Sequence, residues 1–212
     1  MNIVLHILNA SGNLSSSAND IQLIFNNSIR KIVEKLPISN VDVIIADNSR
    51  GAIPEVGIGG RSLNPNLIFI SINHSFPNLK KSIIEHLDRI IAHELHHCMR
   101  RIRPGYGKTL LEAMVSEGLA DHFDYEINHK NPQPWTVALN KEQIKNMLEK
   151  AKVEFYSKRY DHQAWFFGRG NINIPRWAGY SLGFFIVGEY LKKYPSKKPS
   201  QIYNMKAEEF IK

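Results

Sequence analysis

Two histidines and a glutamate at helical spacing point to metal-assisted hydrolysis as the chemistry of this chain. His93, Glu94 and His97 form the pattern His-Glu-x-x-His within the run from Ile91 to Cys98. Residues four apart on a helix lie on the same face, so the two imidazoles can bind one ion, and neutral imidazole is a good zinc ligand. Glu94 would lie beside that ion, where a carboxylate can act as the general base on a metal-activated water.

The flanking sequence predicts one long helix from Asn78 to Arg101, because apolar side chains recur there at helical spacing. His93 and His97 fall at the edge of the apolar stripe, and His96 falls on the opposite side. The stripe consists of Ile83, Ile84, Leu87, Ile90, Ile91, Leu95 and Cys98. The alternative interpretation is a histidine-rich turn on a surface helix, since chance produces such a motif in roughly a few hundredths of chains like this one.

A third ligand is expected from the next predicted helix. Glu117 follows His97 by nineteen intervening residues and would complete a His2Glu set, a known ligand set of catalytic zinc. Asp121 lies four residues later, on the same helical face, where it could accept the free ring N–H of a ligand histidine. Glu112 is a rival ligand, about 140° around the helix from Glu117. Without the histidine motif, Glu117 and Asp121 would be interpreted as a solvated acidic face.

This combination resembles the thermolysin-type zincins, or gluzincins. The run from Ser116 to Phe123, with Gly179-Tyr180-x-x-Gly183, resembles more particularly a bacterial family of predicted zinc-dependent proteases, over roughly Val41 to Tyr194. The resemblance implies a zincin fold and peptide-bond hydrolysis with one Zn²⁺, without implying a substrate. The metzincin branch fits less well, because Arg100 and Arg103 stand where it needs Gly and His. The Gly-Thr-x-Asp element of the aspartate-ligand branch is absent.

The spacing of apolar residues predicts helices and strands in an α+β fold, and the resemblance implies that this fold is zincin-like. We expect a small mixed sheet, the metal-binding helix beneath it, and a mainly helical C-terminal lobe. Residues 1–212 would form a single domain, with lobes of about 1–103 and 104–212. The predicted strands are 3–8, 41–46 and 67–72. The predicted helices are 20–36, 78–101, 109–125, 140–157, 176–194 and a short one within 199–212, with irregular structure at 161–175.

The glycine stretch Gly57-Ile58-Gly59-Gly60-Arg61 has two interpretations. It is not a phosphate-binding loop, because no Gly-Lys-Ser/Thr element follows it. It could be a strand edge that backbone of another chain approaches, as where gluzincin-like proteases hold substrate as an added strand. It could equally be a glycine-rich turn between strands.

The amino-acid composition and the net charge limit which cofactors, membranes and macromolecules we expect the chain to bind. Cys98 is the single cysteine, so no internal disulfide forms, and we expect it to pack as a small apolar residue rather than to bind metal. The residues 1–8 lack the features of a signal peptide, and no apolar run is long enough to span a bilayer, which favours a cytoplasmic protein without a membrane role. The net charge of +7 includes the cluster Arg100-Arg101-x-Arg103 and lysines near 192–198. We interpret these as a solvated face together with a basic helix C-terminus, which the helix dipole favours, so a nucleic-acid partner is not expected.

The expected function is that of a zinc metallopeptidase acting on a peptide or protein substrate, with the oligomeric state left open. Tyr180 is the candidate donor for the oxyanion of the transition state, and His162 is a weaker candidate for that task. A core role with a satisfied hydroxyl is the alternative for Tyr180. The alternative function is a non-catalytic zincin-fold protein that binds metal or peptides without cleavage. Glu94 favours the enzyme, because a structural metal site needs no base.

Overall fold

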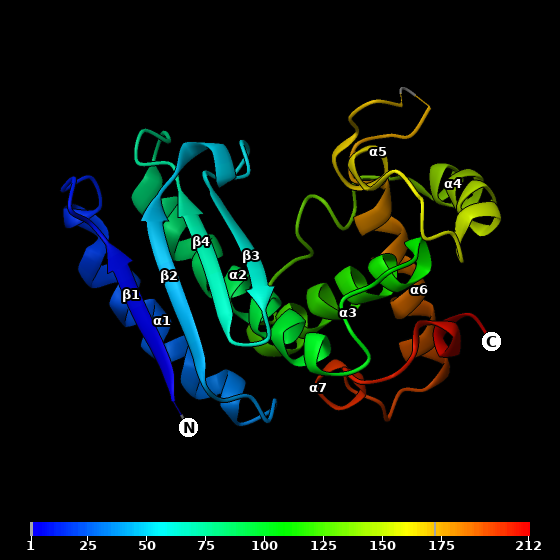
Figure 1. Cartoon of the computed structure of the whole chain (residues 1–212), viewed down its shortest axis with the longest axis horizontal. Helices are drawn as coiled ribbons and strands as arrows, with labels where there is room; N and C mark the ends of the chain where they lie inside the picture. The colour runs from blue at the N-terminus through cyan, green and yellow to red at the C-terminus, as the bar shows by residue number, and fades with distance from the viewer. Residues whose placement is uncertain (1, 172) are drawn as a thin grey trace. The chain divides into compact units, whose positions relative to one another are not determined.

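The computed structural model describes residues 2–171 and 173–212, and the chain divides into two compact units (Figure 1). Met1–Ile102 form the first unit and Arg103–Lys212 form the second. The first unit holds all the strands of the described sheet, and the second is helical. The predicted organisation of both as one functional domain stays a prediction.

A four-stranded mixed sheet forms the first unit and confirms the predicted α+β class. Its order is β1-β2-β4-β3, in which β3 is antiparallel to β4 and the other neighbouring pairs are parallel. The strands span Ile3–Leu8 (β1), Val41–Asp47 (β2), Ile58–Asn64 (β3) and Leu67–Ile72 (β4). The three strands that periodicity predicts are therefore confirmed, and β3, which follows the glycine turn, lies at one edge.

Alternation of side chains decides which face of the sheet is covered. Val41, Val43 and Ile45 on β2 are buried, whereas Asp42, which lies between the first two, is exposed. Successive side chains of a strand point to opposite faces, so the buried set defines one inner face. Two helices, α1 (Ala18–Val33) and α2 (Leu79–Ile102), lie on the same side of the sheet (Figure 1). The helix predicted for 78–101 is thus confirmed as α2.

The glycine stretch forms a turn at Gly57 and then enters edge strand β3, and the approach of another chain to this edge stays a prediction. Gly57 has a φ of +69°, a conformation that glycine adopts easily, and forms the turn. Gly60 lies within edge strand β3, directly against α2. A Cβ atom at Gly60 would lie 2.6 Å from both Ile90 Cγ2 and Glu94 Cγ. Only glycine therefore allows the edge strand to approach the motif helix this closely.

Helices make up the second unit, with α3 and α6 packed along each other at its centre. The elements span Leu110–Asn128 (α3), Lys141–Glu154 (α4), His162–Phe167 (α5), Ala178–Lys193 (α6), Pro199–Ile202 (α7) and Ala207–Ile211 (a 3-10 helix). Phe210 is buried and packs on Tyr190, so the short C-terminal helical segment docks on α6. Helix α5 falls in the region predicted to be irregular, of which residue 172 lies outside the described residues.

Glycines allow the unusually close approach of α3 and α6. A Cβ atom at Gly118 would lie 2.1 Å from the carbonyl oxygen of Gly183, and a Cβ atom at Gly183 would lie 2.1 Å from that of Met114. No side chain fits between two helix backbones at this separation. Gly118 of the Ser116-to-Phe123 run and Gly183 of the Gly179-to-Gly183 run therefore meet at one helix crossing, and Gly118 directly follows Glu117 in the sequence.

Substitution of Gly183 by alanine is expected to destabilise this crossing. The added methyl group can be accommodated only if α3 and α6 move apart, and overpacking of this kind lowers the free energy of unfolding by about 1–3 kcal/mol. Gly188→Ala on the same helix is the matched control, because its Cβ would meet only the His122 ring, at 3.3 Å. Chemical denaturation of the two variants measures the difference, and equal free energies of unfolding would contradict the close crossing.

Among the described residues, none of the helices is both long and apolar enough to cross a bilayer. Helix α6, most of whose first ten residues are apolar, lies within the helical core of the second unit.

Candidate metal centre

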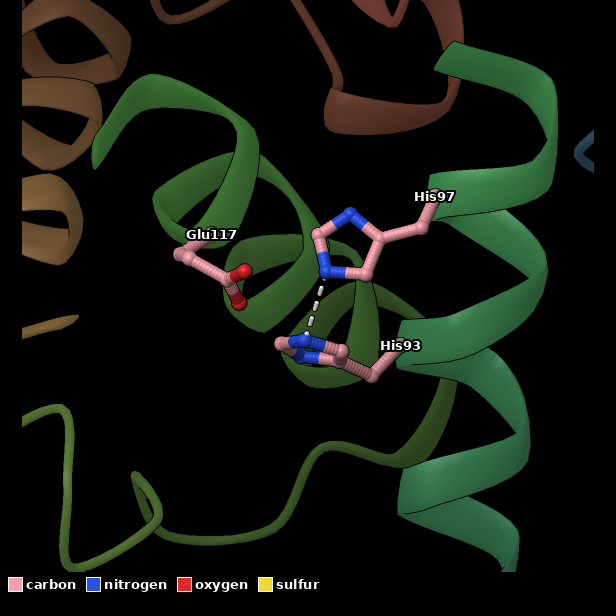
Figure 2. A group of neighbouring side chains, drawn as sticks. All are labelled: His93, His97 and Glu117. Atoms are coloured by element: carbon pink, nitrogen blue, oxygen red, sulfur yellow. Dashed lines mark hydrogen bonds between the residues drawn. The ribbon is translucent and has the colours of Figure 1, made fainter. Parts of the chain in front are cut away.

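Helix α2 presents the two motif histidines side by side. The Nε2 atoms of His93 and His97 are 2.9 Å apart, and the ring planes meet at 83° (Figure 2). Two imidazole nitrogens that bind one tetrahedral zinc at 2.0–2.1 Å lie roughly 3.3 Å apart. The observed pair is close to that separation, so both rings can face one ion with small movements.

Burial in the second half of α2 extends beyond the predicted apolar stripe. His96 is fully buried although it faces away from the stripe, and His97 is 3% exposed, so the interpretation as a surface turn is wrong. Ile84 was assigned to the stripe but is 53% exposed, because it lies in the first turns of the helix, where only one side is covered.

Edge strand β3 holds Glu94. The backbone N–H of Ser62 donates a hydrogen bond to Glu94 Oε2 at 2.6 Å, and the carboxylate is buried. Arg101 donates from Nε to Ser62 Oγ at 2.8 Å and from its guanidinium to the Ser62 carbonyl oxygen at 2.9 Å. The same residue of the strand therefore orients both the candidate base and an arginine of the basic cluster. Arg100 is itself buried, so the interpretation of this cluster as a solvated face is wrong for Arg100. Arg100 and Arg101 do lie in the last turn of α2, as the interpretation as a basic helix C-terminus requires.

Cys98 packs within the first unit as an apolar residue. Its thiol is buried and donates to the Asn64 carbonyl oxygen at 3.5 Å. Burial, with a further contribution from the Glu94 carboxylate, raises the pKa of Cys98 to about 12. Because the thiolate is the form that binds metal, this environment favours the predicted packing role.

A capping box fixes the start of α3 and explains the role of Glu112. The Thr109 hydroxyl accepts from the Glu112 N–H, while the Glu112 carboxylate accepts from the N–H groups of Lys108 and Thr109. Two of the unpaired N–H groups at this helix end, those of Thr109 and Glu112, are thereby satisfied. The rival ligand Glu112 is thus part of the helix cap, a role that its Thr-x-x-Glu spacing could have revealed.

Glu117 and Asp121 are each only 4% exposed, so their interpretation as a solvated acidic face is wrong. The indole N–H of Trp135 donates to Asp121 Oδ1 at 3.2 Å. The phenol of Tyr106 donates to Glu117 Oε1. Burial, followed by the Glu117 carboxylate, raises the pKa of Tyr106 well above its usual value, so the phenol stays protonated and able to donate.

Sequence reasoning missed Tyr106. The available signal was its position between Gly105 and Gly107, a bend in the segment that precedes α3. A tyrosine in such a loop carries no helical or strand periodicity. Nothing in the sequence alone indicated that its hydroxyl would reach Glu117.

The two candidates for oxyanion stabilisation lie in a group of aromatic side chains within the second unit. Tyr180 is half-buried in the first turn of α6 and packs edge-to-face on Phe166, at 5.2 Å between ring centroids. His162 stacks on Phe166, and its Nδ1 lies 3.1 Å from the Tyr160 hydroxyl. Burial and then the Glu117 carboxylate raise the pKa of Tyr160 to about 12. The roles predicted for Tyr180 and Asp121 stay predictions.

Within the described part of the chain, His93, His97 and Glu117 form a group of side chains that could hold a metal ion. One ligand atom from each lies within 4.8 Å of those of the other two (Figure 2). Two imidazoles and a carboxylate are a donor set that zinc accepts in catalytic sites. The group is therefore compatible with zinc.

Comparison with known proteins supports this chemistry at the level of a family. A family model described as "Predicted Zn-dependent protease (DUF2268)" matches residues 21–212. Comparisons with curated proteins and with solved structures find no match.

Proposed function

Because the chain belongs to the family of predicted Zn-dependent proteases, we propose that it is a zinc metallopeptidase of the gluzincin type. His93, His97 and Glu117 would bind one zinc ion, and both compact units would act as one zincin-like domain. The observation that carries the proposal is the convergence of these three donors with Glu94 next to the first of them. A zinc ion bound there would activate a water molecule and polarise a carbonyl group.

Glu94 would act as the general base. Its carboxylate takes a proton from the attacking water and returns that proton to the leaving amine. The Ser62 N–H holds one carboxylate oxygen in place, which restricts the rotamers of the base before substrate arrives. Gly60 has no side chain, and any Cβ atom at this position would displace Glu94.

The substrate would be an extended peptide that adds to the free side of β3. This strand has a neighbour on one side within the described sheet, and edge strands are the usual place for such an addition. Because Ser62 of β3 is bonded to Glu94, a peptide along this edge would run next to the base. Folded proteins rarely offer an extended segment, so unfolded proteins and peptides are the expected substrate class.

Two further residues have proposed roles in this reaction. Tyr180 would donate a hydrogen bond to the oxyanion, for which its half-buried place at the start of α6 leaves the phenol partly accessible. Asp121 would accept the second ring N–H of a ligand histidine. Its fixed orientation through Trp135 suits that task, because ligand histidines are commonly held by a carboxylate.

Removal and return of zinc tests the function. Treatment with a chelator is expected to abolish cleavage of an unfolded, fluorescently labelled protein, and about one equivalent of zinc should restore it. Cleavage that survives complete removal of metal would contradict a metallopeptidase. A zinc-loaded protein that cleaves no unfolded substrate would favour the alternative, a zincin-fold protein that binds metal or peptides without hydrolysis.

A further inference from the structure

The segment before α3 is shaped to bring one tyrosine against the helix. Gly105 and Gly107 have φ values of +118° and +152°, a region that favours glycine. A Cβ atom at Gly107 would lie 2.7 Å from the backbone nitrogen of Ala113. The loop backbone at Gly107 therefore lies directly against the first turns of α3, and a side chain at Gly107 would force the two apart.

Tyr106 is bonded to α3 at two points, through its backbone and through its side chain. The buried hydroxyl of Ser116 donates to the Tyr106 carbonyl oxygen. The Tyr106 phenol donates to Glu117 Oε1. Consecutive residues of one helix thus hold the backbone of the tyrosine and receive its hydroxyl, so the phenol has little freedom to leave the carboxylate.

We propose that Tyr106 is a positioning residue that fixes the Glu117 carboxylate for metal binding. This inference rests on the proposed function, in which Glu117 is a zinc ligand. The phenol engages Oε1 of the carboxylate that would bind the ion. A carboxylate that a hydrogen bond already holds in place loses less conformational entropy when it binds metal. Hydrogen-bond partners of metal ligands commonly raise metal affinity 10- to 100-fold.

Two neighbouring tyrosines have described contacts with other side chains. The Tyr160 hydroxyl lies 3.1 Å from His162 Nδ1, and Tyr180 packs by its ring against Phe166. Tyr106 is the phenol whose hydrogen bond to Glu117 the structure defines.

The test is the zinc affinity of Tyr106→Phe, measured by competition with a chromogenic chelator. We expect zinc to bind about 10- to 100-fold more weakly than in the parent. Tyr190→Phe is the matched control, since its hydroxyl contacts Met205 Sδ at 3.7 Å in the same unit, and its zinc affinity should equal that of the parent. Substitution of zinc by cobalt(II) gives a spectroscopic signature of ligand geometry, which should change in Tyr106→Phe and not in Tyr190→Phe.

The outcomes separate this inference from the proposed function. A parent protein that binds one zinc, with Tyr106→Phe binding equally tightly and with the same cobalt spectrum, would overturn the positioning role and leave the function intact. A parent that binds no zinc would overturn both. If Tyr106→Phe does not fold, Ser116→Ala loosens the backbone anchor while the phenol stays, and we expect its zinc affinity to fall several-fold; unchanged affinity there would overturn the inference.

Discussion

Replacing Glu94 by glutamine is expected to lower kcat/KM for peptide cleavage by about 10⁴-fold while one zinc ion stays bound. General acid–base catalysis contributes about 10²- to 10⁴-fold, and Glu94 would serve as both base and acid in turn. Glutamine has the same shape, so its amide oxygen can still accept from the Ser62 N–H and the contact with Gly60 is preserved. The glutamine amide cannot accept a proton from water and return it to the leaving amine, so only the acid–base function is lost.

Glu85→Gln is the matched control for this experiment. Glu85 lies on the same helix but is exposed and pairs with Lys81, so its neutralisation should leave both zinc content and kcat/KM unchanged. Steady-state cleavage of a quenched fluorescent peptide, with zinc content measured on the same samples, checks both variants. Full turnover by Glu94→Gln would contradict the proposed mechanism.

Substitution of Glu117 by glutamine is expected to weaken zinc binding by at least about 100-fold. The neutral amide oxygen is a poorer zinc ligand than a carboxylate, although glutamine can still accept from the Tyr106 phenol. The fold should be retained, because the substitution keeps the shape of a buried side chain. A loss of affinity in a folded variant would therefore report on the metal ligand itself.

Glu112→Gln tests the rival ligand on the same helix. Glutamine at this position can still complete the capping box with Thr109, so α3 should remain capped. We expect its zinc affinity to match that of the parent in a chelator competition. Weaker binding in Glu112→Gln than in Glu117→Gln would exchange the roles of the two carboxylates and contradict the proposed ligand set.

Periodicity predicted the elements that carry the site. Alternating apolar residues in β2 and the apolar stripe of α2 both follow from burial of at least one face, and both elements occur within a few residues of the predicted bounds. The two histidine ligands could be proposed from the sequence because residues four apart on a helix, such as His93 and His97, lie on the same face.

Contacts between distant segments could not be predicted in this way. The Tyr106–Glu117 hydrogen bond depends on the path of a loop, and the crossing at Gly118 and Gly183 depends on which helices pack together. The burial of Arg100 arises from tertiary packing around α2, which local composition does not encode. The Thr109-x-x-Glu112 cap, in contrast, is recognisable from the sequence, and it argues against Glu112 as the third metal ligand.

X-ray absorption spectroscopy at the zinc edge of the purified protein tests the central claim most directly. We expect one zinc per chain, with two imidazole nitrogens at about 2.0–2.1 Å and oxygen ligands at about 2.0–2.2 Å. Loss of the oxygen contribution in Glu117→Gln would tie that shell to the carboxylate. Zinc that is absent after metal is supplied, or a sulfur shell near 2.3 Å from Cys98, would contradict a His2Glu metallopeptidase centre.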